Sequence, residues 1–155
     1  MLLVSPTKAQ IGRCGELLVQ YELLLLGIES APLSTDAGID LVAYSPGKQE
    51  ARTIQVKANH KPKPSGGKGR AALDWWVPES NPAQVVALVD LSTRSIWLLL
   101  KEELAVLAQQ KSSARFHIYM YSDPEHKPRK LGRLTHSHEF GRYLLCNRAN
   151  ELFGV

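Results

Sequence analysis

Residues 38–58 read GIDLVAYSPGKQEARTIQVKA. Two mostly apolar runs in this stretch are separated by Ser45-Pro46-Gly47-Lys48, a sequence typical of a turn. We therefore predict an antiparallel hairpin, with one strand over Ile39–Tyr44 and the other over Thr53–Ala58.

The register of this hairpin decides which polar side chains meet. If the pairing is centred on the middle of the turn, Asp40 lies directly opposite Gln55, with β-carbons roughly 5 Å apart. Gln55 and Lys57 are two residues apart and share one face of the strand, while Ile54 and Val56 point to the core. A slip of one residue would place Asp40 opposite Val56 and scatter the group. The predicted register gathers Asp40, Gln55 and Lys57 into one cluster.

Two interpretations of this cluster are open. A carboxylate from Asp40, the side-chain oxygen of Gln55 and the backbone carbonyl of Val56 could bind Mg²⁺ or Mn²⁺ beside a phosphate. Lys57 could then orient or deprotonate an attacking water, or stabilise charge on the phosphate. Alternatively, this is an exposed polar face with a cross-strand ion pair between Asp40 and Lys57, contributing about 0.5 kcal/mol. The spacing alone favours the second interpretation.

The rest of the chain predicts a layered α/β domain. A Thr7–Gln10 capping box precedes apolar residues at helical spacing, which predicts a helix over residues 7–26 that Gly27 ends. Residues 85–91 and 96–100 are nearly continuous apolar runs, as expected for central strands covered on both faces. The other expected elements are a loop over Glu29–Ala37, a return to the sheet over Asp74–Val77, a helix over Lys101–Gln110, a strand over Arg115–Tyr121 and a helical segment over His138–Phe153.

Length and composition narrow the class of protein. The 155 residues, 44% of them hydrophobic and 22% charged, fit one globular domain over residues 1–155 and exclude collagen-like, coiled-coil and wholly disordered chains. The longest aliphatic runs are far below the roughly 18 residues of a membrane span. Cys14 and Cys146 stand far apart, which favours packed thiols in a reducing cytoplasm over a disulfide. We expect a soluble cytoplasmic protein without a membrane partner.

Positive charge is concentrated in two segments. Six of the 19 Lys and Arg residues lie between Arg52 and Leu73, where there is no Asp or Glu. The prolines and glycines of Asn59–Arg70 predict an exposed, mobile loop without a regular element. A second basic stretch runs over residues 127–133. Charge at this density suits a phosphate backbone, although a solvated surface loop is the plainer interpretation. The candidate nucleic-acid-binding residues are His60, Lys61, Lys63, Lys68 and Arg70.

Three motifs in order resemble the PD-(D/E)xK nuclease superfamily. They are Gly15-Glu16 in the first helix, Gly38-Ile39-Asp40-Leu41-Val42, and Ile54-Gln55-Val56-Lys57. The chain looks most like the small Holliday-junction-resolvase-like and homing-endonuclease-like members. The resemblance implies a restriction-endonuclease-like core, a mixed central β-sheet flanked by helices, and Mg²⁺-dependent hydrolysis of DNA phosphodiester bonds. Relatives of this size generally work as homodimers, so it also implies a homodimer.

Carried over residue by residue, the resemblance makes Asp40 the metal-binding acid, Lys57 the motif lysine and Glu16 the helix glutamate. Gln55 departs from the usual pattern, because it stands where an Asp or Glu is common and removes one negative charge from the site. Some members are similar in using Gln there. Helical periodicity places Glu16 off the apolar stripe, where a solvated glutamate is the plain interpretation, whereas the resemblance implies that it faces the metal.

The predicted function is therefore a Mg²⁺- or Mn²⁺-dependent endonuclease that acts on duplex or branched DNA. The catalytic candidates are Glu16, Asp40, Gln55 and Lys57, and the metal-binding candidates are Glu16, Asp40, Gln55 and Val56. Because Gln55 weakens the charge of the site, a nuclease-fold binding module without turnover is the alternative. Recognition of structured RNA is a third hypothesis.

Two further features are weaker candidates. His136 and His138 are two residues apart, but no Cys or third His has zinc-site spacing nearby, so a surface role is favoured. Trp75 and Trp76 are adjacent in an expected strand, so one of them must point away from the other. One could stack on a base, although core packing is the commoner use.

Overall fold

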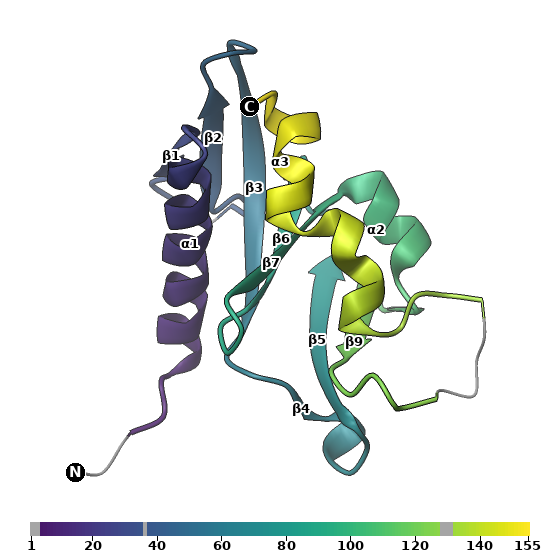
Figure 1. Ribbon diagram of the computed structural model, residues 1–155. Helices are drawn as coiled ribbons and strands as arrows, with labels where there is room; N and C mark the ends of the chain where they lie inside the picture. Colours follow the sequence, from purple (N-terminus) through teal and green to yellow (C-terminus); the bar gives the residue numbers. More distant parts are fainter. Residues whose placement is uncertain (1–3, 36, 128–131) are drawn as a thin grey trace.

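The computed structural model describes residues 4–35, 37–127 and 132–155, which form three layers. Helices α1 and α3 cover one face of a five-stranded sheet, and a four-stranded sheet lies against its other face (Figure 1). The elements in chain order are α1 (Lys8–Leu25), β1 (Glu29–Pro32), β2 (Leu41–Ser45), β3 (Glu50–Asn59), β4 (Lys63–Pro64), η1 (Ser65–Gly67), β5 (Ala71–Pro78), β6 (Val85–Asp90), β7 (Ser95–Leu100), α2 (Lys101–Leu107), β8 (Gln110–Ser112), β9 (Arg115–Tyr121), η2 (Ser137–Tyr143) and α3 (Leu145–Phe153).

The first sheet has the order β1-β2-β3-β6-β7. β3 and β6 pair in parallel, whereas the other neighbours pair antiparallel. The predicted fold class, a mixed sheet flanked by helices, is thus confirmed. β2 pairs with β3 so that Leu41 faces Ile54 and Ser45 faces Glu50, which is the register that the turn length predicts.

Helix α1 begins and ends where the sequence predicts. The Thr7 side chain accepts a hydrogen bond from the Gln10 N–H, and the Gln10 side chain accepts one from the Thr7 N–H, which completes the capping box. At the other end, Gly27 adopts φ of 77°, and the Ile28 N–H donates to the Leu23 carbonyl at 3.0 Å. Leu23 and Ile28 are both fully buried, so this end of the helix is fastened to the core.

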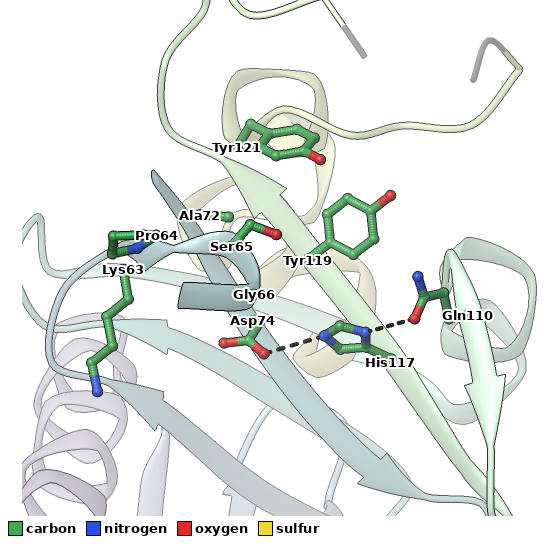
Figure 2. Close-up of a pocket in the computed structure, with 10 residues that line it drawn as sticks. All are labelled: Lys63, Pro64, Ser65, Gly66, Ala72, Asp74, Gln110, His117, Tyr119 and Tyr121. Carbon is green, nitrogen blue, oxygen red and sulfur yellow. Dashed lines mark hydrogen bonds and ion pairs between the residues drawn. The ribbon is translucent and has the colours of Figure 1, made fainter. Parts of the chain in front are cut away.

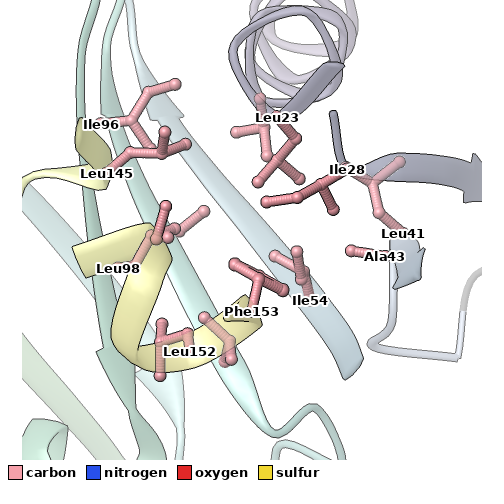
Figure 3. Packing of buried hydrophobic residues seen from close by; sticks show 14 of the residues in the cluster. Leu23, Ile28, Leu41, Ala43, Ile54, Ile96, Leu98, Leu145, Leu152 and Phe153 are labelled. Carbon is pink, nitrogen blue, oxygen red and sulfur yellow. The ribbon is translucent and has the colours of Figure 1, made fainter. Parts of the chain in front are cut away.

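Two apolar clusters lie on opposite faces of the first sheet. In the first, α1 and α3 pack on β2, β3, β6 and β7; Figure 3 shows Phe153 of α3 beside Ile54, with Leu23 of α1 pointing toward the same cluster. In the second, Val86, Leu88 and Leu99 pack against the second sheet. Every residue of β6 is buried because both of its faces are covered.

Several expectations about the strands are wrong. Residues 29–32 form β1 at one edge of the first sheet instead of the expected loop. β7, which was expected to be a central strand, lies at the opposite edge of the same sheet. Asp74–Val77 belongs to β5, which lies in the second sheet, of order β4-β5-β9-β8. Residues 59–70 do hold regular structure, because β4 pairs with β5 and η1 forms one short helical turn. These pairings join distant segments, which local patterns do not record.

The remaining predictions fare unevenly. The helix expected over Lys101–Gln110 ends at Leu107, and the segment 138–153 is divided into η2 and α3. Cys14 and Cys146 are unbridged, as predicted, but they are exposed and not packed. In the part of the chain that the structure describes, no helix has the length and apolarity needed to span a membrane.

Candidate functional site

Asp40 stands immediately before β2 and is fastened to β3 at two points. Its backbone N–H donates to the Ile54 carbonyl at 2.9 Å, and its carboxylate Oδ2 accepts a hydrogen bond from the Val56 N–H at 2.7 Å. The Val56 N–H points to the β2 side of β3, but β2 begins at Leu41, opposite Ile54, and does not extend as far as Val56. The side chain of Asp40 therefore takes the place of a strand partner. The carboxylate is therefore held at the middle of Gln55-Val56-Lys57.

The carbonyl of Val56 opens toward the same edge of β3. In a strand, the N–H and the C=O of one residue point to the same neighbour. Since the Val56 N–H meets the Asp40 carboxylate, the Val56 carbonyl also lies on the Asp40 side of the strand. Two oxygen donors are thus brought to one edge.

Gln55 adds a third oxygen that lacks a partner. Its side chain is only 8% exposed, and no described group lies within hydrogen-bond distance of its Oε1. A buried acceptor left in this state costs about 1–3 kcal/mol, so a cation at this atom would remove a real penalty. Oε1 of Gln55 is thus available to bind a cation or to accept a hydrogen bond.

Gly38 allows the chain to approach Gln55 closely. It adopts φ of 81°, and a Cβ built on it would lie 3.0 Å from Pro82 Cδ and 4.0 Å from Gln55 Nε2. A side chain here would be strained both by the backbone and by Pro82. Gly38 therefore belongs to the architecture of the site, although sequence reasoning assigned it no role beyond the motif.

Lys57 lies on the same face of β3 as Gln55. Val56 and Ala58 face α1, because both approach Gly15, so the alternation of the strand turns Gln55 and Lys57 to the other face. Lys57 is half-buried. The structure thus confirms the shared face that the sequence predicts for these two side chains.

Glu16 follows the closest contact between α1 and β3. A Cβ built on Gly15 would lie 2.6 Å from the Ala58 Cβ and 3.3 Å from Val56 Cγ1, so only glycine permits this approach. The side chain of Glu16 is 24% exposed, and its carboxylate forms an ion pair with Arg13 at 2.7 Å. The helix thus brings Glu16 close to β3, while its observed partner is Arg13, as the plain interpretation of its position anticipates.

These donors fit a hard divalent cation. Mg²⁺ takes oxygen ligands and is commonly held by one or two carboxylates together with substrate phosphates. Asp40, Gln55 and the Val56 carbonyl supply one carboxylate, one amide oxygen and one backbone oxygen. A site built from His and Cys is a poor alternative, since no group of three or more His, Cys, Asp or Glu that could hold a metal occurs among the described residues.

The two histidines singled out by the sequence lie in different surroundings. His136 is buried, with Nε2 2.6 Å from the His126 carbonyl and Nδ1 3.1 Å from Thr135 Oγ1. Both ring nitrogens are thus occupied. The surface role that the sequence favours is therefore wrong for His136, whose ring is held in the interior by these contacts, whereas His138 is exposed as expected.

The predicted nucleic-acid-binding residues follow β3 directly and are all exposed, namely His60, Lys61, Lys63, Lys68 and Arg70. The second basic stretch is described only at Lys127 and at Arg133, because residues 128–131 lie outside the described part of the chain. The first segment therefore presents its cations at the end of the strand that carries Lys57.

Sequence reasoning missed the aromatic side chains on the outer face of the second sheet. His117, Tyr119 and Tyr121 alternate with buried residues along β9. This alternation is visible in the sequence as a strand, but the strand's place beside β5 is not.

Comparisons with known proteins support this architecture. No protein-family model and no curated protein matches the chain. Among solved structures, a bacterial homing endonuclease, I-Ssp6803I, matches with a TM-score of 0.62 and 14% sequence identity. The fold is similar to that of a nuclease. The match covers 97% of this chain and 94% of that chain, so both sheets take part in it.

Proposed function

We propose that this protein is a divalent-metal-dependent endonuclease that hydrolyses DNA phosphodiester bonds. The observation that carries the proposal is the Asp40 carboxylate, whose Oδ2 is held 2.7 Å from the Val56 N–H, together with the buried, unpartnered Oε1 of the preceding residue, Gln55. The fold likeness to a homing endonuclease supports it.

Each residue has a role that follows from its chemistry. Asp40, Gln55 and the Val56 carbonyl would hold Mg²⁺ or Mn²⁺, and Glu16 would complete the site by exchanging Arg13 for the cation. When bound, such a cation supplies Lewis-acid activation of an attacking water and neutralises charge on the phosphate. The ammonium of Lys57 orients the water or stabilises the charge that develops on the phosphate.

The DNA partner follows from the distribution of charge. The exposed cations of residues 60–70 come directly after Lys57 and Asn59 at the end of β3. Contacts of this kind bind backbone phosphates without reading sequence, and they weaken steeply with salt. The proposed substrate is therefore duplex or branched DNA, whose backbone phosphates bind the cations of residues 60–70 next to the site.

A binding module without turnover is the second candidate function. Gln55 motivates it, because a neutral amide in place of a carboxylate lowers the affinity for the cation. Such a module would keep the DNA contacts of the basic segment and lose only the hydrolysis.

A cleavage assay separates the two. Linear, supercoiled and branched DNA are incubated with the protein in Mg²⁺ or Mn²⁺, beside Asp40→Ala and a Glu79→Ala control. Glu79 is an exposed carboxylate paired with Lys111, remote in the sequence from the candidate motifs. Cleavage by wild type and Glu79→Ala but not by Asp40→Ala supports the endonuclease. Binding without cleavage by any of the three proteins supports the module, and a competition with structured RNA tests the third hypothesis.

We further propose that the protein acts as a homodimer through α1. Leu17, Tyr21, Leu24 and Leu25 lie on one side of this helix at helical spacing and are 50–65% exposed. Burying these side chains against a second copy would let two sites address two DNA strands. Sedimentation velocity tests this: Tyr21→Glu should shift the protein to monomer, whereas Val106→Glu, on the exposed face of α2, should not.

The proposed place of action is the cytoplasm. Both cysteines are free thiols, and a reducing compartment keeps them so.

A further inference from the structure

The first sheet is covered on both faces, whereas one face of the second sheet points away from the core. Along β5 and β9, one set of side chains packs into the core and the alternate set points outward. The outward set comprises Asp74, Trp76, His117, Tyr119 and Tyr121, of which the rings are half-buried. Figure 2 shows His117, Tyr119 and Tyr121 following one another along β9.

The rings of this face support one another in a fixed row. Trp76 stacks on His117 with centroids 4.1 Å apart and planes 3° apart, and the Arg115 guanidinium lies 5.0 Å from the Trp76 ring. Tyr119 lies 5.6 Å from His117, and Tyr121 lies 5.4 Å from Tyr119. Arrangements of this kind hold aromatic planes in place before any ligand arrives.

A hollow of about 290 Å³ lies beside this row. Tyr119 and Tyr121 form one side, and Ser65 and Gly66 of η1 form another. Asp74 and Gln110 fix the imidazole of His117 between them, at 3.2 Å and 3.3 Å. The hollow is at the lower end of the size of small-ligand pockets, and it combines ring surfaces with a few fixed polar atoms.

Its chemistry matches one kind of ligand. A nucleobase offers a flat face for stacking on tyrosine and an N–H donor, such as the ring N–H of thymine or uracil, for a carboxylate such as Asp74, whose side chain is 51% exposed. Two cations lie near the hollow: Lys63 lines it, and Arg133 is near enough to Tyr119 to act electrostatically on its hydroxyl. Burial, followed by the neighbouring Tyr121, raises the pKa of the Tyr119 hydroxyl.

We propose that this hollow binds an unpaired base of a single-stranded nucleic-acid segment, which stacks on one of Tyr119 and Tyr121 and packs edge-on against the other, since the two ring planes are 67° apart. That the ligand belongs to the DNA substrate rests on the proposed function, since Asn59, two residues beyond Lys57, donates to the Asp74 carbonyl at 2.8 Å and ties β3 to this face. A base in paired duplex cannot enter, because its faces are covered by its neighbours in the stack. The chain would thus favour DNA with unpaired bases over fully paired duplex.

Binding without a metal tests the site separately from cleavage. Fluorescence anisotropy with labelled 15-nucleotide oligo-dT, oligo-rU and a fully paired duplex is measured in EDTA for wild type, Tyr119→Ala, Tyr121→Ala, Tyr119→Phe and Tyr44→Ala. Tyr44 is a control, because it is an exposed tyrosine of the first sheet. Thermal unfolding establishes that each variant is folded.

The proposal expects a loss specific to unpaired bases. Tyr119→Ala and Tyr121→Ala should each weaken oligo-dT binding about 5- to 150-fold, the equivalent of one lost stacking contact. Tyr119→Phe and Tyr44→Ala should bind like wild type, and duplex binding should change little. Equal affinity of all folded variants for oligo-dT, or an equal loss on duplex, would overturn the proposal. If the protein cleaves DNA but the tyrosine variants bind oligo-dT like wild type, the proposed function stands and the base site is refuted. If the tyrosine variants lose oligo-dT binding but the protein does not cleave DNA, the base site stands and the proposed function is refuted. Equal losses on oligo-dT and oligo-rU would support a base site indifferent to the sugar.

Discussion

The edge of β3 and the outer face of β9 carry two different kinds of chemistry on one chain. At β3, a few oxygen donors belong to neighbouring residues at one edge of the strand, and Asp40 Oδ2 is held in place by the Val56 N–H. At β9, rings spread along a row and share their contacts, as Trp76 and His117 do. Loss of one ligand atom can abolish metal binding at the β3 site, whereas loss of one ring from the β9 row removes only part of the affinity for a ligand. The two regions should therefore respond to substitution in different ways.

The largest effect is expected at Asp40. Asp40→Asn keeps the shape of the side chain but removes its charge, so cleavage should fall at least about 100-fold, in line with the loss of a key electrostatic group. DNA binding in EDTA should change little, because the cations of residues 60–70 are untouched. Cleavage kinetics and anisotropy on the same DNA provide the measurement. A loss of binding equal to the loss of cleavage would contradict the separation of the metal site from the DNA contacts of residues 60–70.

The next effect concerns the contact that brings α1 to β3. Gly15→Ala forces a Cβ to within 2.6 Å of the Ala58 Cβ, which should lower the free energy of unfolding by about 1–3 kcal/mol. The matched control is Gly12→Ala in the same helix, where nothing lies within 4 Å of the added Cβ. That control should stabilise the protein by up to about 1 kcal/mol. Urea unfolding measures both, and equal changes in the two variants would show that the close approach is unimportant.

A smaller and opposite effect is expected at Gln55. Gln55→Leu removes the buried acceptor without a partner, so the metal-free protein should become more stable by about 1 kcal/mol. The same variant should lose the stabilisation that Mn²⁺ gives to wild type. Thermal unfolding with and without Mn²⁺ checks both statements. Destabilisation of the metal-free Gln55→Leu would mean that the amide oxygen already has a partner.

Gln55→Glu tests whether residue 55 coordinates the metal ion. It restores the carboxylate common in the family that the sequence resembles, so half-maximal cleavage should require several-fold less Mg²⁺ than in wild type. A metal titration of the cleavage rate gives this value. An unchanged metal requirement would place residue 55 outside the coordination of the cation.

The smallest effect is expected at Glu139, which lies outside both regions. Hydrogen bonds, first from the Thr135 N–H and then from the His136 N–H, hold its pKa below the ordinary value of 4.5. A lowered folded-state pKa contributes stability above the unfolded pKa, and this contribution is lost as the pH falls through the folded pKa. Glu139→Gln should therefore cost less than about 1 kcal/mol at neutral pH and nothing in stronger acid. Unfolding midpoints between pH 3 and pH 7, beside a Glu125→Gln control, test the sign.

The contrast between the two regions also explains what the sequence could predict. The hairpin is local: the turn sets its register, so the opposition of Asp40 and Gln55 and the shared face of Gln55 and Lys57 follow from residues 38–58 alone. Gly15, which the sequence offers only as part of the first-helix motif, lies at the closest contact between α1 and β3. Capping chemistry at Thr7 and Gly27 is local as well, and both ends of α1 are where the sequence puts them.

The second sheet could not be predicted because it depends on distant pairing. The strand at Arg115–Tyr121 is correct to the residue, yet nothing local to it shows that Trp76 pairs with His117 forty-one positions away. β1 was missed for a related reason, since its burial is slight and its support comes from the edge of β2 and from Gln20 of α1, which donates to the Ser30 carbonyl. Only the fold brings Asp74, Gln110 and His117 together.

The most direct test is a crystal structure of the protein soaked in Mn²⁺, with the anomalous signal used to locate the ion. One peak should lie about 2.1 Å from a carboxylate oxygen of Asp40, from Oε1 of Gln55 and from the Val56 carbonyl oxygen, with Lys57 facing the ion's open side. A bound ion elsewhere, with the Gln55 oxygen turned to a protein donor, would contradict the claim that this edge of β3 is a metal-binding site.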